Sequence, residues 1–130
     1  MKRTRIAPSL ADYPAPFHAL LTDTDVYDSS CSPEARVVYI EKGGGYYLKR
    51  AAKGELHTEA VMTRYFHTKA LGAEVLDYVS EGEFDWLLTS RVVGEDCTHE
   101  SVLARPEWLC DTIATQLRAL HELDASDCPI

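Results

Sequence analysis

Three consecutive glycines at positions 43–45 separate two segments that each have the composition of a β-strand. Residues 35–40 are mostly β-branched or apolar, and residues 46–51 begin with two tyrosines and a leucine. Glycine adopts the backbone conformations that tight turns need, whereas β-branched and aromatic residues favour extended chain. The pattern therefore predicts an antiparallel hairpin. Because an isolated hairpin is marginally stable in water, it requires further strands or a helix packed against it.

Other segments supply these additional elements. Further strands are expected at residues 25–28, 75–79 and 86–90. Helices are expected at residues 56–70 and 106–121, the second opened by Pro106. The order of strand, strand, strand, helix, strand, strand, helix predicts an α+β fold with a mainly antiparallel five-stranded sheet and one inserted helix. N-terminal lobes of protein kinases share this order, although fold order alone does not establish function.

The second strand of the hairpin carries the first candidate binding residues. Side chains alternate across a strand, so Tyr47 and Lys49 share one face at a separation of about 7 Å. An aromatic ring beside an ammonium group suits adenine and its phosphates, since the ring stacks and the charge holds phosphate oxygens. The strand alone fits an ordinary exposed lysine better than a binding site.

A carboxylate on the expected helix gives this lysine a partner. Glu59 shares one helical face with Met62, Phe66 and Ala70, so it is expected to point inward with them. An inward carboxylate needs a cation, and we expect Lys49 to meet Glu59 within about 4 Å. Kinases use such a pair to set a lysine against phosphates. A purely structural ion pair, or a solvated glutamate at the helix start, fits the same residues.

Composition and charge exclude some classes of partner. The net charge of −8 argues against nucleic acid, which needs a basic binding surface. No apolar segment approaches the roughly 20 residues that span a bilayer. Residues 1–8 are basic, but Asp12, Tyr13 and Pro14 follow in place of an export segment, so we expect no membrane partner and a cytoplasmic location. No cysteine has a close histidine or cysteine in metal-ligand spacing, so no metal site is expected in these residues.

Several short motifs occur along the chain: Arg5-Ile6-Ala7-Pro8, Tyr47-Leu48-Lys49, Glu59, Asp85-Trp86-Leu87-Leu88, Val92-Val93-Gly94-Glu95-Asp96, Leu117-Arg118-Ala119-Leu120-His121 and Leu123-Asp124-Ala125-Ser126-Asp127-Cys128-Pro129. These motifs resemble those of the aminoglycoside 3′-phosphotransferases, a family with a protein-kinase-like fold. The Leu-His-x-Leu-Asp…Cys-Pro pattern is the most specific of them. Together they cover essentially the whole chain.

The resemblance implies a role for each matching residue. Lys49 matches a lysine that binds ATP or GTP phosphates, Glu59 matches its helix partner, and Tyr47 matches an aromatic residue that stacks on adenine. Ser90, through its carbonyl, and Val92, through its amide, match hinge positions that bind the base edge. Ser32 matches a serine in the loop over the phosphates, and the absence of glycine from residues 28–33 distinguishes this loop from that of protein kinases.

The same resemblance implies functional groups that these residues do not contain. The family's catalytic loop, His-Gly-Asp followed by an asparagine, supplies the base and one Mg²⁺ ligand, and a later Ile-Asp-x-Gly supplies another. Neither motif occurs here, and the chain has no asparagine. We therefore expect a truncated protein whose catalytic Asp lies beyond Ile130, with an N-terminal lobe at residues 1–90, a hinge at 91–97 and the start of a helical lobe at 98–130.

The leading functional hypothesis is the nucleotide-binding half of an ATP-dependent kinase that phosphorylates a hydroxyl of an aminoglycoside, inactive as it stands. Other small-molecule kinases of the same fold and a non-catalytic nucleotide-binding or interaction module are the alternatives. One further interaction is expected from the last helix. Its apolar stripe is expected to pack against a lobe that is absent from the chain and, when exposed, to cause self-association. The stripe consists of Leu109, Ile113, Leu117 and Leu120.

Overall fold

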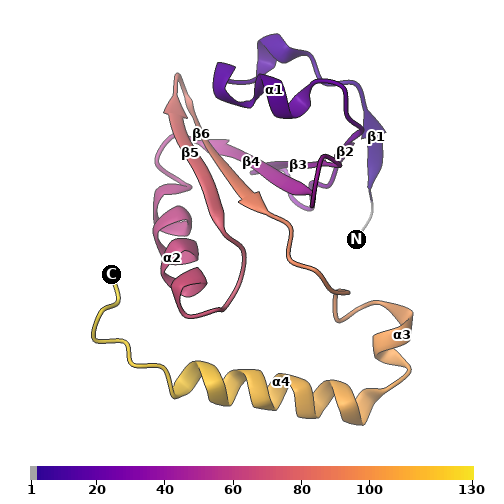
Figure 1. Cartoon of the computed structure of the whole chain (residues 1–130), viewed down its shortest axis with the longest axis vertical. Helices are drawn as coiled ribbons and strands as arrows, with labels where there is room; N and C mark the ends of the chain where they lie inside the picture. Colours follow the sequence, from indigo (N-terminus) through magenta and orange to yellow (C-terminus); the bar gives the residue numbers. More distant parts are fainter. Residues whose placement is uncertain (1–2) are drawn as a thin grey trace. The chain divides into compact units, whose positions relative to one another are not determined.

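A computed structural model describes residues 3–130 of the chain. These residues form two units, one ending at Val92 and one running from Val93 to Ile130. The first unit contains a six-stranded antiparallel sheet with the order β1-β2-β3-β4-β6-β5 (Figure 1). Its strands are β1 (Thr4–Ile6), β2 (Val26–Asp28), β3 (Arg36–Ile40), β4 (Tyr46–Ala52), β5 (Val75–Glu81) and β6 (Phe84–Ser90). The expected α+β fold with an antiparallel sheet is confirmed.

The sheet has one strand more than the five that the sequence predicted. The additional strand is β1, which pairs with β2 so that Arg5 lies opposite Tyr27. With only three residues and no apolar alternation, β1 carries no strand signal of its own. Its extended conformation comes from its pairing with β2.

The hairpin of β3 and β4 forms as predicted, and Gly45 shows why its turn needs glycine. The φ angle of Gly45 is +90°, a conformation that other residues rarely adopt. A Cβ atom at this position would lie 2.7 Å from the hydroxyl oxygen of Tyr39. A larger residue would therefore strain the backbone and displace a buried ring.

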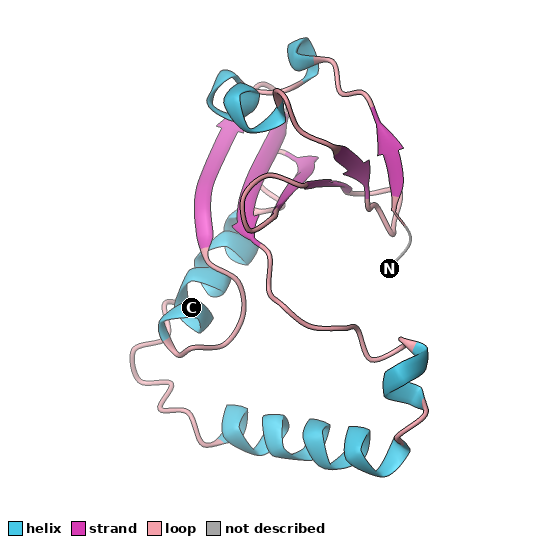
Figure 2. Cartoon of the chain, turned by 45° about the vertical axis from the view of Figure 1, so that its right-hand side comes forward, coloured by secondary structure: helices cyan, strands magenta, loops and turns pink. Residues whose placement is uncertain are grey.

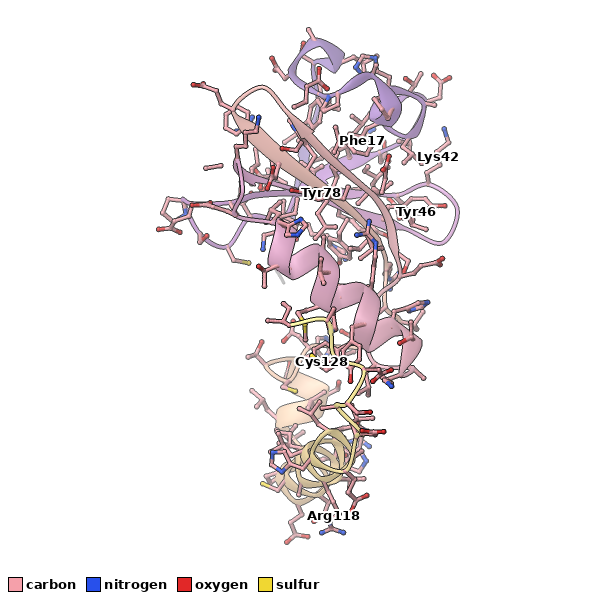
Figure 3. All side chains as sticks on the ribbon, turned by 90° about the vertical axis from the view of Figure 1, so that its left-hand side faces the viewer. Phe17, Lys42, Tyr46, Tyr78, Arg118 and Cys128 are labelled. Carbon is pink, nitrogen blue, oxygen red and sulfur yellow. The ribbon has the colours of Figure 1, made fainter. Side chains whose placement is uncertain are left out.

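One face of the sheet packs against the helical segment that follows β1. This segment comprises η1 (Leu10–Asp12), η2 (Ala15–Phe17) and α1 (His18–Leu21). The segment lies over the sheet (Figure 2), and Figure 3 labels Phe17 within it. Phe17 and Leu21 from the segment join Leu48 and Trp86 from the sheet in one core. Because Leu48 faces this core, Tyr47 and Lys49 on either side of it in β4 face the other way.

The opposite face packs against α2 (His57–Thr68). Leu56 and Ala60 meet Ala51 and Leu87 of the sheet in a second, smaller core. The expected inward stripe is therefore wrong in part: Ala60 and Tyr65 are the buried residues of the helix, and Ala70 lies beyond its end. Small side chains at Ala51 and Ala60 let the helix approach the sheet, and Glu59 sits at the border of this contact.

The second unit contains α3 (Glu100–Leu103), which the sequence did not predict, and α4 (Pro106–His121), which it did. No residue of α4 is buried. No helix within residues 3–130 is long and apolar enough to cross a membrane.

Candidate functional site

The strand and the helix bring together the two charged residues that the sequence paired. Lys49 Nζ lies 2.7 Å from Glu59 Oε2, so the predicted ion pair is formed. The lysine side chain is 31% exposed and the glutamate 43% exposed. Both groups thus remain open to solvent on the α2 side of the sheet, and the ammonium keeps two donors for another anion.

Tyr47 lies on the same face as Lys49 and belongs to a row of three tyrosines. Tyr27, Tyr39 and Tyr47 are directly opposite one another on β2, β3 and β4. Their ring centroids are 6.2 Å apart for Tyr27 and Tyr39, and 5.1 Å apart for Tyr39 and Tyr47. Tilted aromatic pairs at these distances attract one another. The row gives the site a broad aromatic surface, of which the sequence predicted only one member.

Arg3 is a second residue at this site that the sequence did not predict. Its Nη2 donates a hydrogen bond of 2.6 Å to the hydroxyl of Tyr47. Its guanidinium carbon lies 3.8 Å from the centroid of the Tyr39 ring, a cation–π contact. Arg3 therefore fixes the hydroxyl end of the predicted stacking residue.

The predicted hinge residues lie at and just beyond the end of β6, since Ser90 is its last residue and Val92 comes two residues later. Pairing of β4 with β6 places Ser90 opposite Tyr46, one residue from Tyr47. The backbone N–H of Arg91 then donates to the carbonyl of Gly45 at 3.0 Å. Val92 belongs to no regular element and its side chain is 58% exposed. The sheet register thus brings the start of the hinge next to the aromatic row.

Ser32 lies in the loop between β2 and β3, and its predicted role finds least support. The loop is held at its base, where the backbone N–H of Ser30 donates to Asp28 Oδ1 at 2.8 Å and that of Val37 donates to Ser30 Oγ at 3.0 Å. Ser32 itself is exposed and lines a cavity with Arg36 and Arg50. These arginines extend from the face of the sheet opposite Lys49. The described contacts do not bring Ser32 to Lys49.

Asp85 is a buried carboxylate that positions the helix carrying Glu59. It is fully buried on β6, and its Oδ2 accepts hydrogen bonds from the backbone N–H groups of Gly54 at 2.8 Å and Leu56 at 3.2 Å. Leu56 is the N-cap residue of α2 and contributes no side-chain cap, but its own backbone N–H is satisfied by Asp85 across the fold. The sequence signal was a single carboxylate inside an otherwise apolar strand.

The surroundings of Asp85 favour its charged form. Burial acts to raise the pKa of this carboxyl, but hydrogen bonds outweigh it and lower the pKa below its ordinary value. The neighbouring hydroxyls of Ser80 and Tyr78 and the backbone N–H groups of Leu56 and Gly54 lower the pKa. Both backbone groups donate to Oδ2, whereas Oδ1 has no hydrogen-bond partner among residues 3–130. Tyr78 also packs beside the start of α2, with its ring centroid 6.1 Å from that of His57 (Figure 3). The loop before α2 is therefore attached to β6 through a charged group.

A profile of the phosphotransferase enzyme family matches residues 33–130, about three quarters of the chain. The chain belongs to this family. Its matched part includes the ion pair, the aromatic residues of β3 and β4, Ser90 and Val92. Membership of this family relates the fold described above to that of phosphotransferases.

The chain also resembles a curated bacterial protein along its whole length. It is 43% identical over 130 residues to a probable aminoglycoside 3′-phosphotransferase of Lactococcus lactis subsp. lactis (strain IL1403). The alignment covers 100% of this chain and 49% of the relative, so the chain spans about half the length of the phosphotransferase that it matches.

Within residues 3–130, no group of three or more His, Cys, Asp or Glu side chains is placed to hold a metal ion.

Proposed function

We propose that this chain forms the nucleotide-binding part of an ATP-dependent (or GTP-dependent) kinase that phosphorylates a hydroxyl group of an aminoglycoside. The observation that carries the proposal is the ion pair between Lys49 and Glu59, at 2.7 Å, beside Tyr47 on one face of the sheet. Membership of the phosphotransferase enzyme family supports the reaction type. The name of the 43% identical relative supports the acceptor, and with it a role in resistance to such antibiotics.

The residues present fit a nucleotide. Lys49 would bind oxygens of the α- and β-phosphates as a point charge, while Glu59 keeps its ammonium in place. The ring of Tyr47 would stack on the base, and the backbone groups of Ser90 and Val92 would bind its edge. Bound ATP with Mg²⁺ would supply the phosphoryl group, which requires positioning and charge neutralisation more than covalent help from the protein.

Isothermal titration calorimetry of the chain with ADP and Mg²⁺ tests this assignment. Lys49→Ala should weaken binding at least about tenfold, equivalent to about 1.4 kcal/mol, because the phosphates lose the one side-chain cation proposed to bind them. Glu59→Gln should weaken it less, since the lysine stays but is no longer fixed. Lys53→Ala removes an exposed lysine four residues further along and serves as the matched control. Equal losses in the Lys49 and Lys53 variants would refute the proposed site.

Phosphate transfer by the 130-residue chain should not exceed background. The physical reason is that it holds neither the His-Gly-Asp motif nor an asparagine, the groups that the resemblance assigns to the base and to Mg²⁺. Incubation with radiolabelled ATP and kanamycin or neomycin measures this directly. Clear turnover would mean that other residues of the chain supply the base.

A further inference from the structure

Two arginines lie directly opposite each other on the face of the sheet that the proposed nucleotide site does not use. The pairing of β3 with β4 sets Arg36 against Arg50, and the pairing of β4 with β6 sets Arg50 against Trp86. Like charges directly opposite on neighbouring strands repel each other. Within residues 3–130, neither guanidinium forms an ion pair or a hydrogen bond with another side chain. Nothing in the described chain therefore neutralises this pair by direct contact.

Aromatic rings hold one of the two arginines in place. The guanidinium carbon of Arg50 lies 4.5 Å from the ring centroid of Phe84 and 5.6 Å from that of Trp86. Cation–π contacts of this kind orient a guanidinium without using its hydrogen-bond donors. Arg50 thus keeps all five donors for a partner, and Arg36 faces the same space.

That space is a cavity of about 410 Å³ between the sheet and the chain that follows β1. This volume falls in the range of small-molecule sites. Its lining combines the two arginines with buried apolar floor residues and with residues of the N-terminal segment. The apolar or aromatic members include Ile6, Pro8, Tyr13, Leu48, Phe84 and Trp86.

The electrostatics of the lining agree with the geometry. Burial raises the pKa of the Tyr13 hydroxyl, and the charges of Arg36 and Arg50 act in the opposite direction. The positive field of the pair therefore reaches across the cavity to the N-terminal segment. Asp12 also lines the cavity and Asp28 lies in the field of Arg36, so part of the positive charge is offset from a distance.

We propose that this cavity binds a small organic anion, with its oxyanion group between Arg36 and Arg50 and a flat apolar body against Tyr13 and Trp86. Guanidinium groups match phosphate and carboxylate oxygens in a two-pronged geometry, which explains why two arginines are placed together. The rings and aliphatic side chains of the lining account for the apolar body. The site lies across the sheet from Lys49 and is independent of the proposed nucleotide site.

Phenyl phosphate is the probe, and the fluorescence of Trp86 is the readout. Trp108→Phe removes the other of the two tryptophans, which belongs to the second unit and does not line the cavity. In this background at low salt, phenyl phosphate should produce a saturable change in Trp86 emission. Arg36→Gln and Arg50→Gln should each weaken binding at least about tenfold, which corresponds to about 1.4 kcal/mol. Arg36→Lys, which keeps the charge and loses the planar fork, should retain part of the affinity.

Matched probes separate the contribution of the charge from that of the apolar body, and one control variant tests which face of the sheet binds the probe. Inorganic phosphate carries the charge without the body, phenol carries the body without the charge, and both should bind more weakly than phenyl phosphate. Lys49→Gln should leave binding unchanged, since Lys49 lies on the other face.

The proposal is overturned if no saturable change occurs, if phenol or inorganic phosphate binds as well as phenyl phosphate, or if Lys49→Gln removes the signal. If Arg50→Gln loses the native circular dichroism spectrum, the affinity of the Arg36→Gln variant decides the result, since Arg36 is exposed.

Discussion

The sheet unit and the unit from Val93 to Ile130 differ in how far their apolar side chains are buried. All buried hydrophobic residues of the described chain except Val102 belong to the sheet unit. In that unit, the chain after β1 covers one face of the sheet and α2 covers the other. In α4, by contrast, Ile113, Leu117 and Leu120 are 43%, 49% and 40% exposed.

This difference separates two ways of stabilising a helix. Contacts between Ala60 and the sheet support α2, and Asp85 binds the N–H group at its start. The helix α4 has the same amphipathic character without a buried residue, so its stability depends on local propensity and on its length of 16 residues. Isolated helices of this length are marginal in water. The self-association that the sequence suggested for this apolar stripe stays a prediction.

The largest expected contrast comes from removing one leucine from each unit. Leu48 is 1% exposed in the core of the sheet, so Leu48→Ala should lower the free energy of unfolding by about 2–5 kcal/mol. Leu117→Ala on α4 should change it by no more than about 0.5 kcal/mol, since its side chain is already half exposed. Urea unfolding followed by circular dichroism compares the two. Similar losses for both leucines would show that α4 has a hidden packing partner.

A smaller effect is expected from the buried carboxylate. Asp85→Asn removes the charge that accepts the N–H groups of Gly54 and Leu56, and should cost about 1–3 kcal/mol of stability. Asp111→Asn, on the exposed surface of α4, is the control and should cost almost nothing.

The pH dependence of stability checks the same residue. The pKa of Asp85 in the folded protein is lowered from 3.8. Its contribution to the free energy of unfolding is therefore present above pH 3.8, and it is lost as the pH falls through the lowered pKa of the folded protein. Unfolding measured between neutral pH and the acid limit should therefore show a weaker acid dependence in Asp85→Asn. An unchanged acid dependence in this variant would contradict the linkage.

The smallest effect on stability, with a clear effect on assembly, is expected on α4. Leu117→Glu places a charge in the apolar stripe and should reduce self-association measured by sedimentation velocity at tens of micromolar (on the order of typical assay concentrations). Thr115→Glu adds the same charge on the opposite side of the helix and should leave the association unchanged. A parent chain that sediments as a clean monomer would refute the association itself.

The distance along the chain between contacting residues explains what the sequence could predict. Lys49 and Glu59 are 10 residues apart, on adjacent elements whose periodicities are visible, and their ion pair was found. Asp85 meets Leu56 across 29 residues, and Arg3 meets Tyr47 across 44. No local pattern encodes these contacts, because they depend on the strand order and register of the finished sheet.

The same reason accounts for the errors in the fold. The strand β1 exists only through its partner β2, and three residues leave no periodicity to detect. The inward face of α2 was misplaced because the larger apolar residues Met62 and Phe66 were expected inside. The sheet instead accepts Ala60, whose small side chain allows a closer approach.

The turn at Gly45 holds the first residue after β6. Its carbonyl accepts the N–H group of Arg91, which ties the chain beyond β6 to the hairpin. There is no room for a methyl group at Gly45, so any other residue at this position would have to displace the Tyr39 ring or the turn itself. The residue that follows β6 is therefore held by a turn about a third of the chain earlier, and Val92 is the first residue beyond this hydrogen bond.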